Sequence, residues 1–297
     1  MDALTADQIA RIRTVSHFKD SRDAAQNLGV LYISYVSAFV DLLKIYPLAR
    51  KPRVIADIGT GYGWLAIALA RQTDARIIAV DNDGARMNAA RKIADILGVE
   101  HRIDWRIGAL PHLPIADQEA DVTFCVEVIE HVDNRPEIVR ELGRVTRDHL
   151  VVTSPNRNFP IIRHDTGLPF CHWLPAHVRD WYAALCGRSH LQHGNLFWSP
   201  GMVSAALPEF ERASRFLQFL SVKHFFESEV QIYNAARIPT PMTRLARRLV
   251  LGACGLLGKN AIHLSPNLAS TFRRTKGQRS EPLDQVGSDG ECREMLT

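Results

Sequence analysis

Three glycines alternate with other residues in segment 57–63, which has the sequence Asp-Ile-Gly-Thr-Gly-Tyr-Gly. Glycine has no Cβ and tolerates positive φ, so Gly59, Gly61 and Gly63 permit a sharp turn and let a ligand approach the backbone. The acid Asp81 follows Gly61 by about 20 residues, a spacing that favours hydrogen bonds from two ribose hydroxyls. The pattern predicts a site for a nucleotide-like cofactor.

The spacing of the glycines also separates the classes of cofactor. A dinucleotide fingerprint that begins at Gly59 requires glycine at position 64, where this chain has Trp64. The loop lacks the Lys-Ser/Thr pair that binds the phosphates in nucleoside triphosphate loops. The third glycine instead comes one residue early, at Gly63, and the acid Asp57 stands two residues before the first. A dinucleotide is therefore disfavoured and a nucleoside triphosphate loop is excluded.

The segments around this loop predict an α/β fold, a Rossmann-like doubly wound sheet. The expected strands are 53–57, 76–81, 104–107, 121–126 and 149–153, and the expected helices are 64–71, 85–97 and 136–145. Strands that alternate with helices of this length form βαβ units in a parallel sheet covered on both faces. Such sheets bind ligands at the carboxyl ends of the strands, where the glycine loop lies. Residues 210–222 could return to this sheet.

The Asp-x-Gly-x-Gly-x-Gly pattern resembles motif I of the class I S-adenosylmethionine-dependent methyltransferases. The resemblance extends through 79–83 and 121–134 and covers roughly residues 50–155. It implies that S-adenosylmethionine is bound, with Asp57, Gly59 and Gly61 at its methionine end and Asp81 at its ribose. The full set of expected cofactor-binding residues is Asp57, Gly59, Thr60, Gly61, Gly63, Asp81, Asn82, Ala109, Leu110 and Glu127.

The adenine end of the site departs from the family pattern. Many relatives carry an acidic residue after the third strand that accepts a hydrogen bond from the adenine amino group. This chain has Gly108-Ala109-Leu110 there. We expect backbone amides, or the side chain of Leu110, to contact the adenine instead.

Three titratable residues follow the fourth expected strand: Glu127, Glu130 and His131. In a helical turn that begins at the strand end, positions i, i+3 and i+4 share one face. The run resembles that of ubiquinone-biosynthesis methyltransferases and of small-RNA 2′-O-methyltransferases, where two Glu and one His bind Mg²⁺. A hard cation could lower the pKa of a substrate hydroxyl. Alternatively, the Glu-His pair orients the loop and contacts the substrate.

Segment 155–200 is rich in Pro, His and Trp and is expected to form a lid, because loops of this length are usually functional. Its titratable residues His164, Asp165 and His172 follow the fifth strand, on the rim of the expected site. Imidazole suits a base near neutral pH. Together with His131 these three are the candidate catalytic residues. The alternatives are a further metal ligand and a loop histidine bonded to backbone.

The basic character of the chain is concentrated near its C-terminus. The net charge is +4, yet residues 237–280 hold nine Lys or Arg and no acid, so the remainder carries 4 − 9, or −5. Three arginines, Arg244, Arg247 and Arg248, precede the apolar stretch 249–257, which is too short to span a bilayer. Such a segment can lie in a membrane interface. A packed helix and a nucleic-acid patch are the alternatives.

The expected organisation is a helical N-terminal cap, a methyltransferase domain and C-terminal additions. The boundaries are 1–50 for the cap, 51–235 for the domain, 236–277 for a basic amphipathic segment and 278–297 for a disordered tail. The N-terminus lacks the features of a signal peptide, and the five cysteines form no Cys-x-x-Cys pair. We therefore expect a cytoplasmic protein, in peripheral contact with the inner face of the membrane through 242–277.

These features predict an enzyme that methylates a hydroxyl of a small, hydrophobic or lipid-linked acceptor. One alternative is an RNA 2′-O-methyltransferase. Nucleic acid is disfavoured as a partner because no basic, aromatic-interleaved module is present outside the C-terminal segment. A second alternative is a non-catalytic, cofactor-binding subunit of a biosynthetic complex. The sequence does not indicate an oligomeric state.

Overall fold

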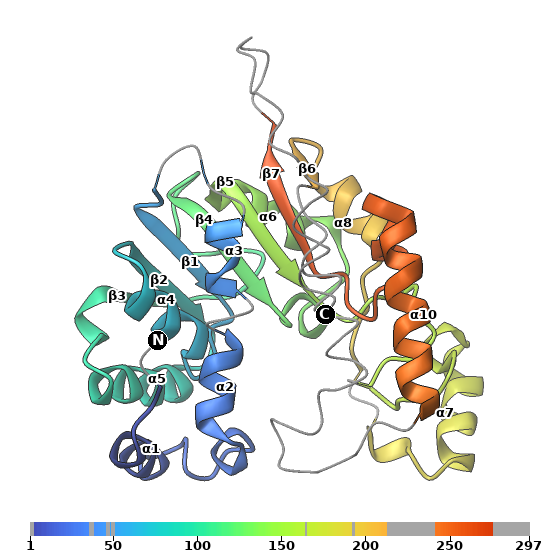
Figure 1. The fold of residues 1–297 in the computed structure, drawn as a ribbon, viewed down its shortest axis with the longest axis horizontal. Helices are drawn as coiled ribbons and strands as arrows, with labels where there is room; N and C mark the ends of the chain where they lie inside the picture. The colour runs from blue at the N-terminus through green and yellow to red at the C-terminus, as the bar shows by residue number, and fades with distance from the viewer. Residues whose placement is uncertain are drawn as a thin grey trace.

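The computed structural model describes residues 3–35, 39–45, 48, 51–163, 165–191, 194–212 and 241–275. At its centre is a seven-stranded sheet with the order β3-β2-β1-β4-β5-β7-β6 (Figure 1). The strands are β1 Val54–Ile58, β2 Arg76–Asp81, β3 Ile103–Ile107, β4 Ala120–Val126, β5 Thr146–Thr153, β6 Phe210–Arg212 and β7 Ser270–Arg274. The five strands expected from the sequence are all present, in parallel pairs.

Helices connect and cover these strands. The α-helices are α1 Ala6–Arg13, α2 Leu28–Tyr35, α3 Leu42–Ile45, α4 Trp64–Gln72, α5 Gly84–Ile96, α6 Pro136–Val145, α7 Ala176–Leu185, α8 Pro200–Ala206 and α10 Pro241–Leu257. Short 3₁₀ helices are η1 Asp23–Ala25, η3 Glu100–Arg102, η4 Ile129–His131, η5 Cys171–Trp173, η6 Ser189–Leu191 and η7 Gly258–Leu264. The expected helices 64–71, 85–97 and 136–145 correspond to α4, α5 and α6.

The sheet is mixed, whereas a wholly parallel one was expected. The difference comes from β7, which pairs antiparallel with both β5 and β6. Its residues belong to the basic segment 236–277, so the expected boundary at residue 236 does not separate that segment from the sheet. Within β7, Phe272 is buried, whereas Arg273 and Arg274 are partly buried. Because of this basic pair, the segment lacks the apolar run that indicates a strand in the sequence. Residues 210–222 were expected to return to the sheet. Strand β6 confirms this for residues 210–212, and residues 213–222 lie outside the described residues.

Side chains that alternate along the strands enter two separate cores. On one face, Ile55 and Ile77 pack with residues of α4, α5 and the N-terminal helices. On the other, Ala56 and Ile78 pack with residues of α6 and α8. Burial on both faces explains why the strands are apolar runs without alternation. The doubly wound α/β prediction is confirmed.

The N-terminal cap lies against the glycine-loop end of the first face. Helix α1 begins with a capping box, in which Thr5 accepts from Gln8 N and the Gln8 side chain accepts from Thr5 N. Phe18, which follows α1, is fully buried and makes edge-to-face contacts with Tyr62 and Trp64, with ring centroids 4.9 and 5.9 Å apart. The cap is thereby fixed to the loop that the sequence singles out.

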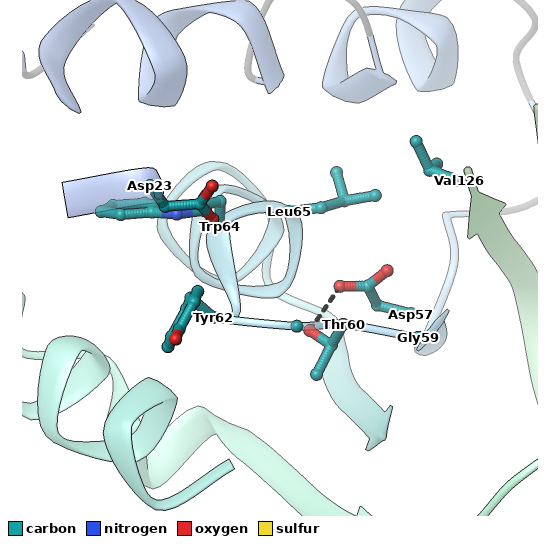
Figure 2. Close-up of a pocket in the computed structure, with 9 residues that line it drawn as sticks. Asp23, Asp57, Gly59, Thr60, Tyr62, Trp64, Leu65 and Val126 are labelled. Carbon is teal, nitrogen blue, oxygen red and sulfur yellow. Dashed lines mark hydrogen bonds between the residues drawn. The ribbon is translucent and has the colours of Figure 1, made fainter. Parts of the chain in front are cut away.

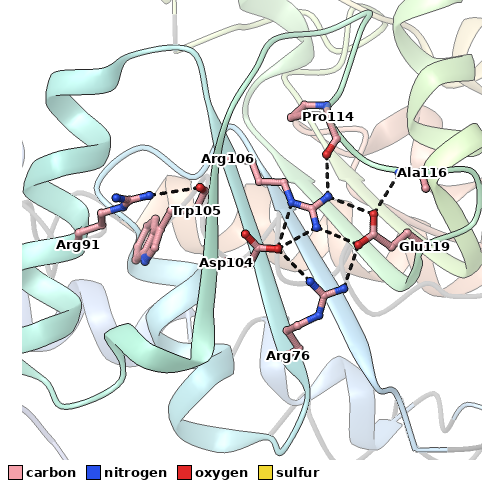
Figure 3. A network of polar contacts seen from close by, with 8 residues as sticks. All are labelled: Arg76, Arg91, Asp104, Trp105, Arg106, Pro114, Ala116 and Glu119. Carbon is pink, nitrogen blue, oxygen red and sulfur yellow. Dashed lines mark hydrogen bonds and ion pairs between the residues drawn. The ribbon is translucent and has the colours of Figure 1, made fainter.

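A network of ion pairs connects β2, β3 and the residue that precedes β4, away from the glycine loop (Figure 3). The guanidinium of Arg106 on β3 lies 2.8 Å from Asp104 and 2.9 Å from Glu119, and Arg76 at the start of β2 also reaches Glu119 at 2.9 Å. The hydrogen bond from Arg106 is the largest of the effects that lower the pKa of Glu119 to about 2. Because Arg76 begins β2 and Glu119 precedes β4, the network stabilises the sheet at the end away from the ligand edge.

Candidate active site

The glycine loop follows β1 in a backbone conformation that only glycine adopts readily. Gly59, Gly61 and Gly63 have φ values of 72°, 58° and 79°. A Cβ at Gly59 would lie 2.3 Å from Cγ2 of Val128, far inside van der Waals contact. The amides of Gly59 and Thr60 both donate to the carbonyl of Val80, at 2.8 and 3.0 Å, and so tie the loop to β2.

Two carboxylates hold this loop in shape. Oδ2 of Asp57 accepts from Thr60 Oγ1 at 2.7 Å and from the amide of Ala66 at 3.2 Å. Burial raises the pKa of Asp57 to about 6. Oδ2 of Asp81 accepts from the amide of Gly61 at 2.8 Å, and Oδ1 from the amide of Asp83 at 3.0 Å. The acid expected to bind ribose thus also bonds the loop itself.

A pocket opens beside the loop (Figure 2). Four expected cofactor residues line it: Asp57, Gly59, Thr60 and Gly61. The other lining residues, which the sequence pattern does not indicate as site residues, are Asp23, Tyr62, Trp64, Leu65 and Val126. Tyr62, Trp64 and Leu65 lie within or next to the glycine motif in the sequence, and this position is a signal that could have identified them as lining residues. Asp23 carries no signal in the sequence, because it comes from η1 in the N-terminal cap.

The remaining expected cofactor residues lie outside this pocket. Gly63 caps the N-terminus of α4, and Asn82 is exposed after β2. Ala109 is exposed, but the side chain of Leu110 is buried in the second core and is not available to an adenine ring. The chain turns back tightly here, since a Cβ at Gly108 would lie 2.4 Å from Pro114. Ile107, which pairs with Asp81, is a large apolar side chain exposed at this edge, at 60%.

The carboxylate of Glu127 lies just beyond the end of β4. Its residue has a φ of 54°, and its amide donates to the carbonyl of Thr153 at 3.0 Å. Oε1 accepts from Asn267 Nδ2, also at 3.0 Å. Burial raises the pKa of Glu127 to about 7. Asn267 comes from the C-terminal segment, and nothing in the sequence pattern indicates its role.

Glu130 and His131 point in different directions. The Glu130 side chain is fully buried, and burial together with the charge of Glu127 holds its pKa well above the usual value. His131 is half exposed, with Nδ1 3.0 Å from Oδ1 of Asn195 and Nε2 3.9 Å from Glu130 Oε1. The turn is the 3₁₀ helix η4, which begins at Ile129 and leaves Glu127 outside it. The three side chains therefore do not share the face expected of an α-helical turn.

This arrangement does not fit the expected magnesium ion. Within the ranges that the structure describes, no group of three His, Cys, Asp or Glu side chains could hold a metal. The prediction that Glu127, Glu130 and His131 bind Mg²⁺ is therefore not supported. The alternative, in which the Glu-His pair orients the loop, agrees with the contact between His131 and Asn195.

Two side chains of the lid bond the same backbone carbonyl. The carbonyl of Arg157 accepts from Nε2 of His172 at 3.0 Å and from Nε1 of Trp173 at 2.6 Å. Burial lowers the pKa of His172. Of the other lid candidates, Asp165 is partly buried and its amide donates to Ile162 O at 3.4 Å, while His164 lies outside the described residues. For His172 the geometry agrees with the backbone-bonded alternative.

Residues 195–198, near the end of the lid, contact the Glu127–His131 turn and the residues that follow it. The ring of Phe197 lies 5.8 Å from that of His172, and the amide of Leu196 donates to the carbonyl of Glu130 at 2.9 Å. Nε1 of Trp198 donates to the carbonyl of Asp133 at 3.1 Å. The histidine-containing lid and the Glu127–His131 turn, which are separate in the sequence, therefore meet at this segment.

The C-terminal segment forms the wall behind Glu127. Buried Asn156, in the Ser-Pro-Asn turn after β5, donates from Nδ2 to the carbonyls of Ile262 and Ser265, both at 2.8 Å. The amide of Leu268 donates to Ser154 O at 2.9 Å, which brings Asn267 to the site. Residues far apart in the sequence thus meet beside Glu127.

Residues 56–150 match a family described as a methyltransferase domain. The chain contains a class I methyltransferase domain. The predicted family and Rossmann-like fold are confirmed. In its matched part this domain spans the glycine loop, Asp81 and the Glu127–His131 turn.

Curated relatives match this methyltransferase domain over part of their length. Norajmaline N-methyltransferase of Rauvolfia serpentina is 29% identical over 97 residues, which are 33% of this chain and 33% of that protein. Ubiquinone biosynthesis O-methyltransferase of Azorhizobium caulinodans is 31% identical over 134 residues, 43% of this chain and 51% of that protein. The chain thus spans between a third and a half of the length of these relatives.

A solved structure shows the same fold over a longer stretch. It is a chain of the complex between the Haloferax volcanii Trm112 methyltransferase activator and a methyltransferase, with a TM-score of 0.50 and 13% sequence identity. The match covers 83% of this chain and 91% of that one. At this identity the likeness concerns the fold alone.

Proposed function

We propose that the protein transfers a methyl group from S-adenosylmethionine to a hydroxyl of a small apolar acceptor. The observation that carries the proposal is the position of Glu127. The preceding residue, Val126, lines the pocket beside the glycine loop. A carboxylate with a pKa of about 7 at this place suits a general base at neutral pH.

We assign the methionine end of the cofactor to the pocket lined by Asp57, Gly59, Thr60 and Gly61. Asp81, at the neighbouring strand end, is placed for the ribose hydroxyls. For the adenine we propose the exposed side chain of Ile107, because Leu110 is buried. When bound, the cofactor supplies an electrophilic methyl group on a positively charged sulfur.

The residues of the chain then have distinct tasks. Glu127 accepts the proton of the acceptor hydroxyl, and Asn267 orients its carboxylate through the 3.0 Å hydrogen bond. His131 and Asn195 hold the turn and the lid segment together. Holding both reactants in this arrangement contributes to catalysis by proximity.

The apolar character of the acceptor is inferred from exposed apolar side chains beside the Glu130 turn and in the lid. Val132 and Leu196 are partly exposed beside the Glu130 turn, and Phe170 and Trp173 are about half exposed in the lid. The relatives are named for both N- and O-methylation, so the choice of a hydroxyl rests on Glu127. RNA is disfavoured further because Arg273 and Arg274 of the basic segment pair with Asp148 and Glu209.

The test is transfer of tritiated methyl groups from S-adenosylmethionine into fractionated cell extract. We expect label in the lipid-soluble fraction and a loss of about 100-fold or more in Glu127→Gln, the size typical of a missing general base. The control is Glu137→Gln, an exposed glutamate on α6, which is expected to keep full activity. Label in RNA instead would favour the RNA alternative. Cofactor binding with no transfer would favour the non-catalytic subunit.

We also propose that α10 docks the protein on an anionic membrane surface. Met242, Leu245, Leu249 and Leu256 share one face of this helix at spacings of three, four and seven, and each is more than half exposed. The opposite face carries Leu251 and Cys254, which pack against Ala261. Arg244 and Arg248 are exposed on the same helix, which lies at the outer edge of the fold (Figure 1). The described helices include none that could cross a membrane.

Co-sedimentation with vesicles tests this surface. We expect binding to phosphatidylglycerol vesicles at low salt and weak binding to phosphatidylcholine. The double variant Leu245→Ser/Leu249→Ser is expected to reduce binding by about 10-fold or more, since burying one leucine contributes about 1.5–3 kcal/mol. Leu185→Ser, at an equally exposed leucine on α7, is the control. Equal binding by wild type and the double variant would contradict the proposal.

A further inference from the structure

We propose that Asp23 binds the α-ammonium group of the cofactor's methionine moiety, so that the N-terminal cap forms part of the cofactor site. This inference rests on the proposed use of S-adenosylmethionine. Asp23 belongs to η1, more than thirty residues before the glycine loop in the chain. Its side chain nevertheless lines the same pocket as Gly59, Thr60 and Gly61 (Figure 2).

The cap that carries Asp23 is fixed on the loop by specific contacts. Nδ1 of His17 lies 3.2 Å from the hydroxyl of Tyr62, and the ring of Phe18 packs edge-on against Tyr62. Oδ1 of Asp23 accepts from Nε2 of Gln26 at 3.0 Å, and Gln26 is itself buried. This hydrogen bond restricts the orientation of the Asp23 carboxylate.

The charges of the pocket favour a cation beside Asp23. Burial raises the pKa of Asp23, and the positive charges of Arg86 and Arg22 lower it by less. The charges of these arginines therefore offset only part of the free energy that it costs to desolvate the Asp23 carboxylate. The other lining carboxylate, Asp57, already accepts from Thr60 and Ala66. The Gln26 side chain that donates to Asp23 is a neutral amide. An ammonium group would add a charge-assisted hydrogen bond that Gln26 cannot provide.

Two cationic groups of S-adenosylmethionine could be the partner: the ammonium and the sulfonium. S-adenosylhomocysteine keeps the ammonium but has a neutral sulfur. 5′-Methylthioadenosine has neither the ammonium nor the sulfonium. Comparing these two ligands isolates the amino-acid end of the cofactor.

The experiment is isothermal titration calorimetry of the full chain with both ligands. Asp23→Asn keeps the shape and the ability to accept from Gln26, and it is expected to weaken S-adenosylhomocysteine binding about 10-fold, the size of a lost charge-assisted hydrogen bond. Binding of 5′-methylthioadenosine is expected to stay within about 2-fold. The matched control is Asp20→Asn, an exposed acid of the same cap that does not line the pocket, with both affinities unchanged.

Three results would overturn the inference. Unchanged S-adenosylhomocysteine affinity in Asp23→Asn would show that the carboxylate makes no such contact. An equal loss for both ligands would assign Asp23 a structural role in the cap. If wild type bound neither ligand, the proposed function itself would fail, a result distinct from an effect confined to the variant.

Discussion

Gly59→Ala is expected to lower the affinity for S-adenosylhomocysteine by about 100-fold or more, because a methyl group at this position displaces the loop that forms the pocket. The new Cβ would lie 2.3 Å from Cγ2 and 2.9 Å from Cγ1 of Val128. Overpacking of this kind costs about 1–3 kcal/mol, and the positive φ of 72° adds about 1–2 kcal/mol. Calorimetry measures the affinity, and denaturant unfolding measures the stability.

Two further variants separate the overlap from the backbone strain. Gly98 has a nearly identical φ of 73°, but a Cβ there meets no atom within 4 Å. Gly98→Ala is therefore expected to cost about 1–2 kcal/mol of stability and to leave the affinity unchanged. In Gly59→Ala/Val128→Ala the overlap is relieved, and part of the affinity is expected to return. Wild-type affinity in Gly59→Ala would contradict the assignment of the pocket.

Asp57→Asn is expected to stabilise the protein above pH 6 while weakening the site. Burial raises the pKa of Asp57 from 3.8 in the unfolded chain to about 6 in the fold. Below pH 3.8 the carboxyl is protonated in both states and costs nothing. Between pH 3.8 and 6 the unfolded chain loses this proton while the folded state keeps it, so the free energy of unfolding falls across this range and is constant above it. The shift corresponds to about 3 kcal/mol as an order of magnitude, which asparagine avoids.

Unfolding by guanidinium chloride between pH 4 and pH 8 measures this difference. The stabilisation of Asp57→Asn is expected to grow from near zero at pH 4 to its full value at pH 7. Asp95→Asn, at an exposed carboxyl on α5, is the control and should show no such dependence. The affinity for the cationic cofactor is expected to fall by about 10-fold, since a nearby negative charge is lost. Parallel pH profiles for wild type and Asp57→Asn would refute the argument.

Local patterns in the sequence were sufficient for the strand–helix alternation and the glycine turn. The apolar runs that became β1, β2 and β4 are short segments whose burial on both faces depends on their own composition. The positive φ values of Gly59, Gly61 and Gly63 follow from the absence of a Cβ. Such features depend on neighbours within one element, and this is why they could be predicted.

The directions of several side chains around the candidate site could not be predicted in this way. The spacing of Glu127, Glu130 and His131 predicted an α-helical turn. In the structure this turn is a 3₁₀ helix, and the side chain of Glu130 is buried. Leu110 was expected at the adenine and is instead buried in the second core. In both cases long-range packing decided the direction of a side chain that local spacing left open.

The sequence by itself determined the family of the domain and the positions of the glycine loop, Asp57 and Asp81 at the strand ends. Only the tertiary structure decided which distant residues complete that site. The hydrogen bond from Asn267 to Glu127 joins positions 140 residues apart, and Asp23 reaches the glycine loop from the N-terminal cap. The segment that leads into antiparallel β7 places Asn267 beside Glu127, and the packed cap places Asp23 beside the glycine loop. The physical reason is one of range. A sequence motif constrains the local backbone and adjacent residues, whereas the residues that complete a pocket come from any part of the chain that packs against it.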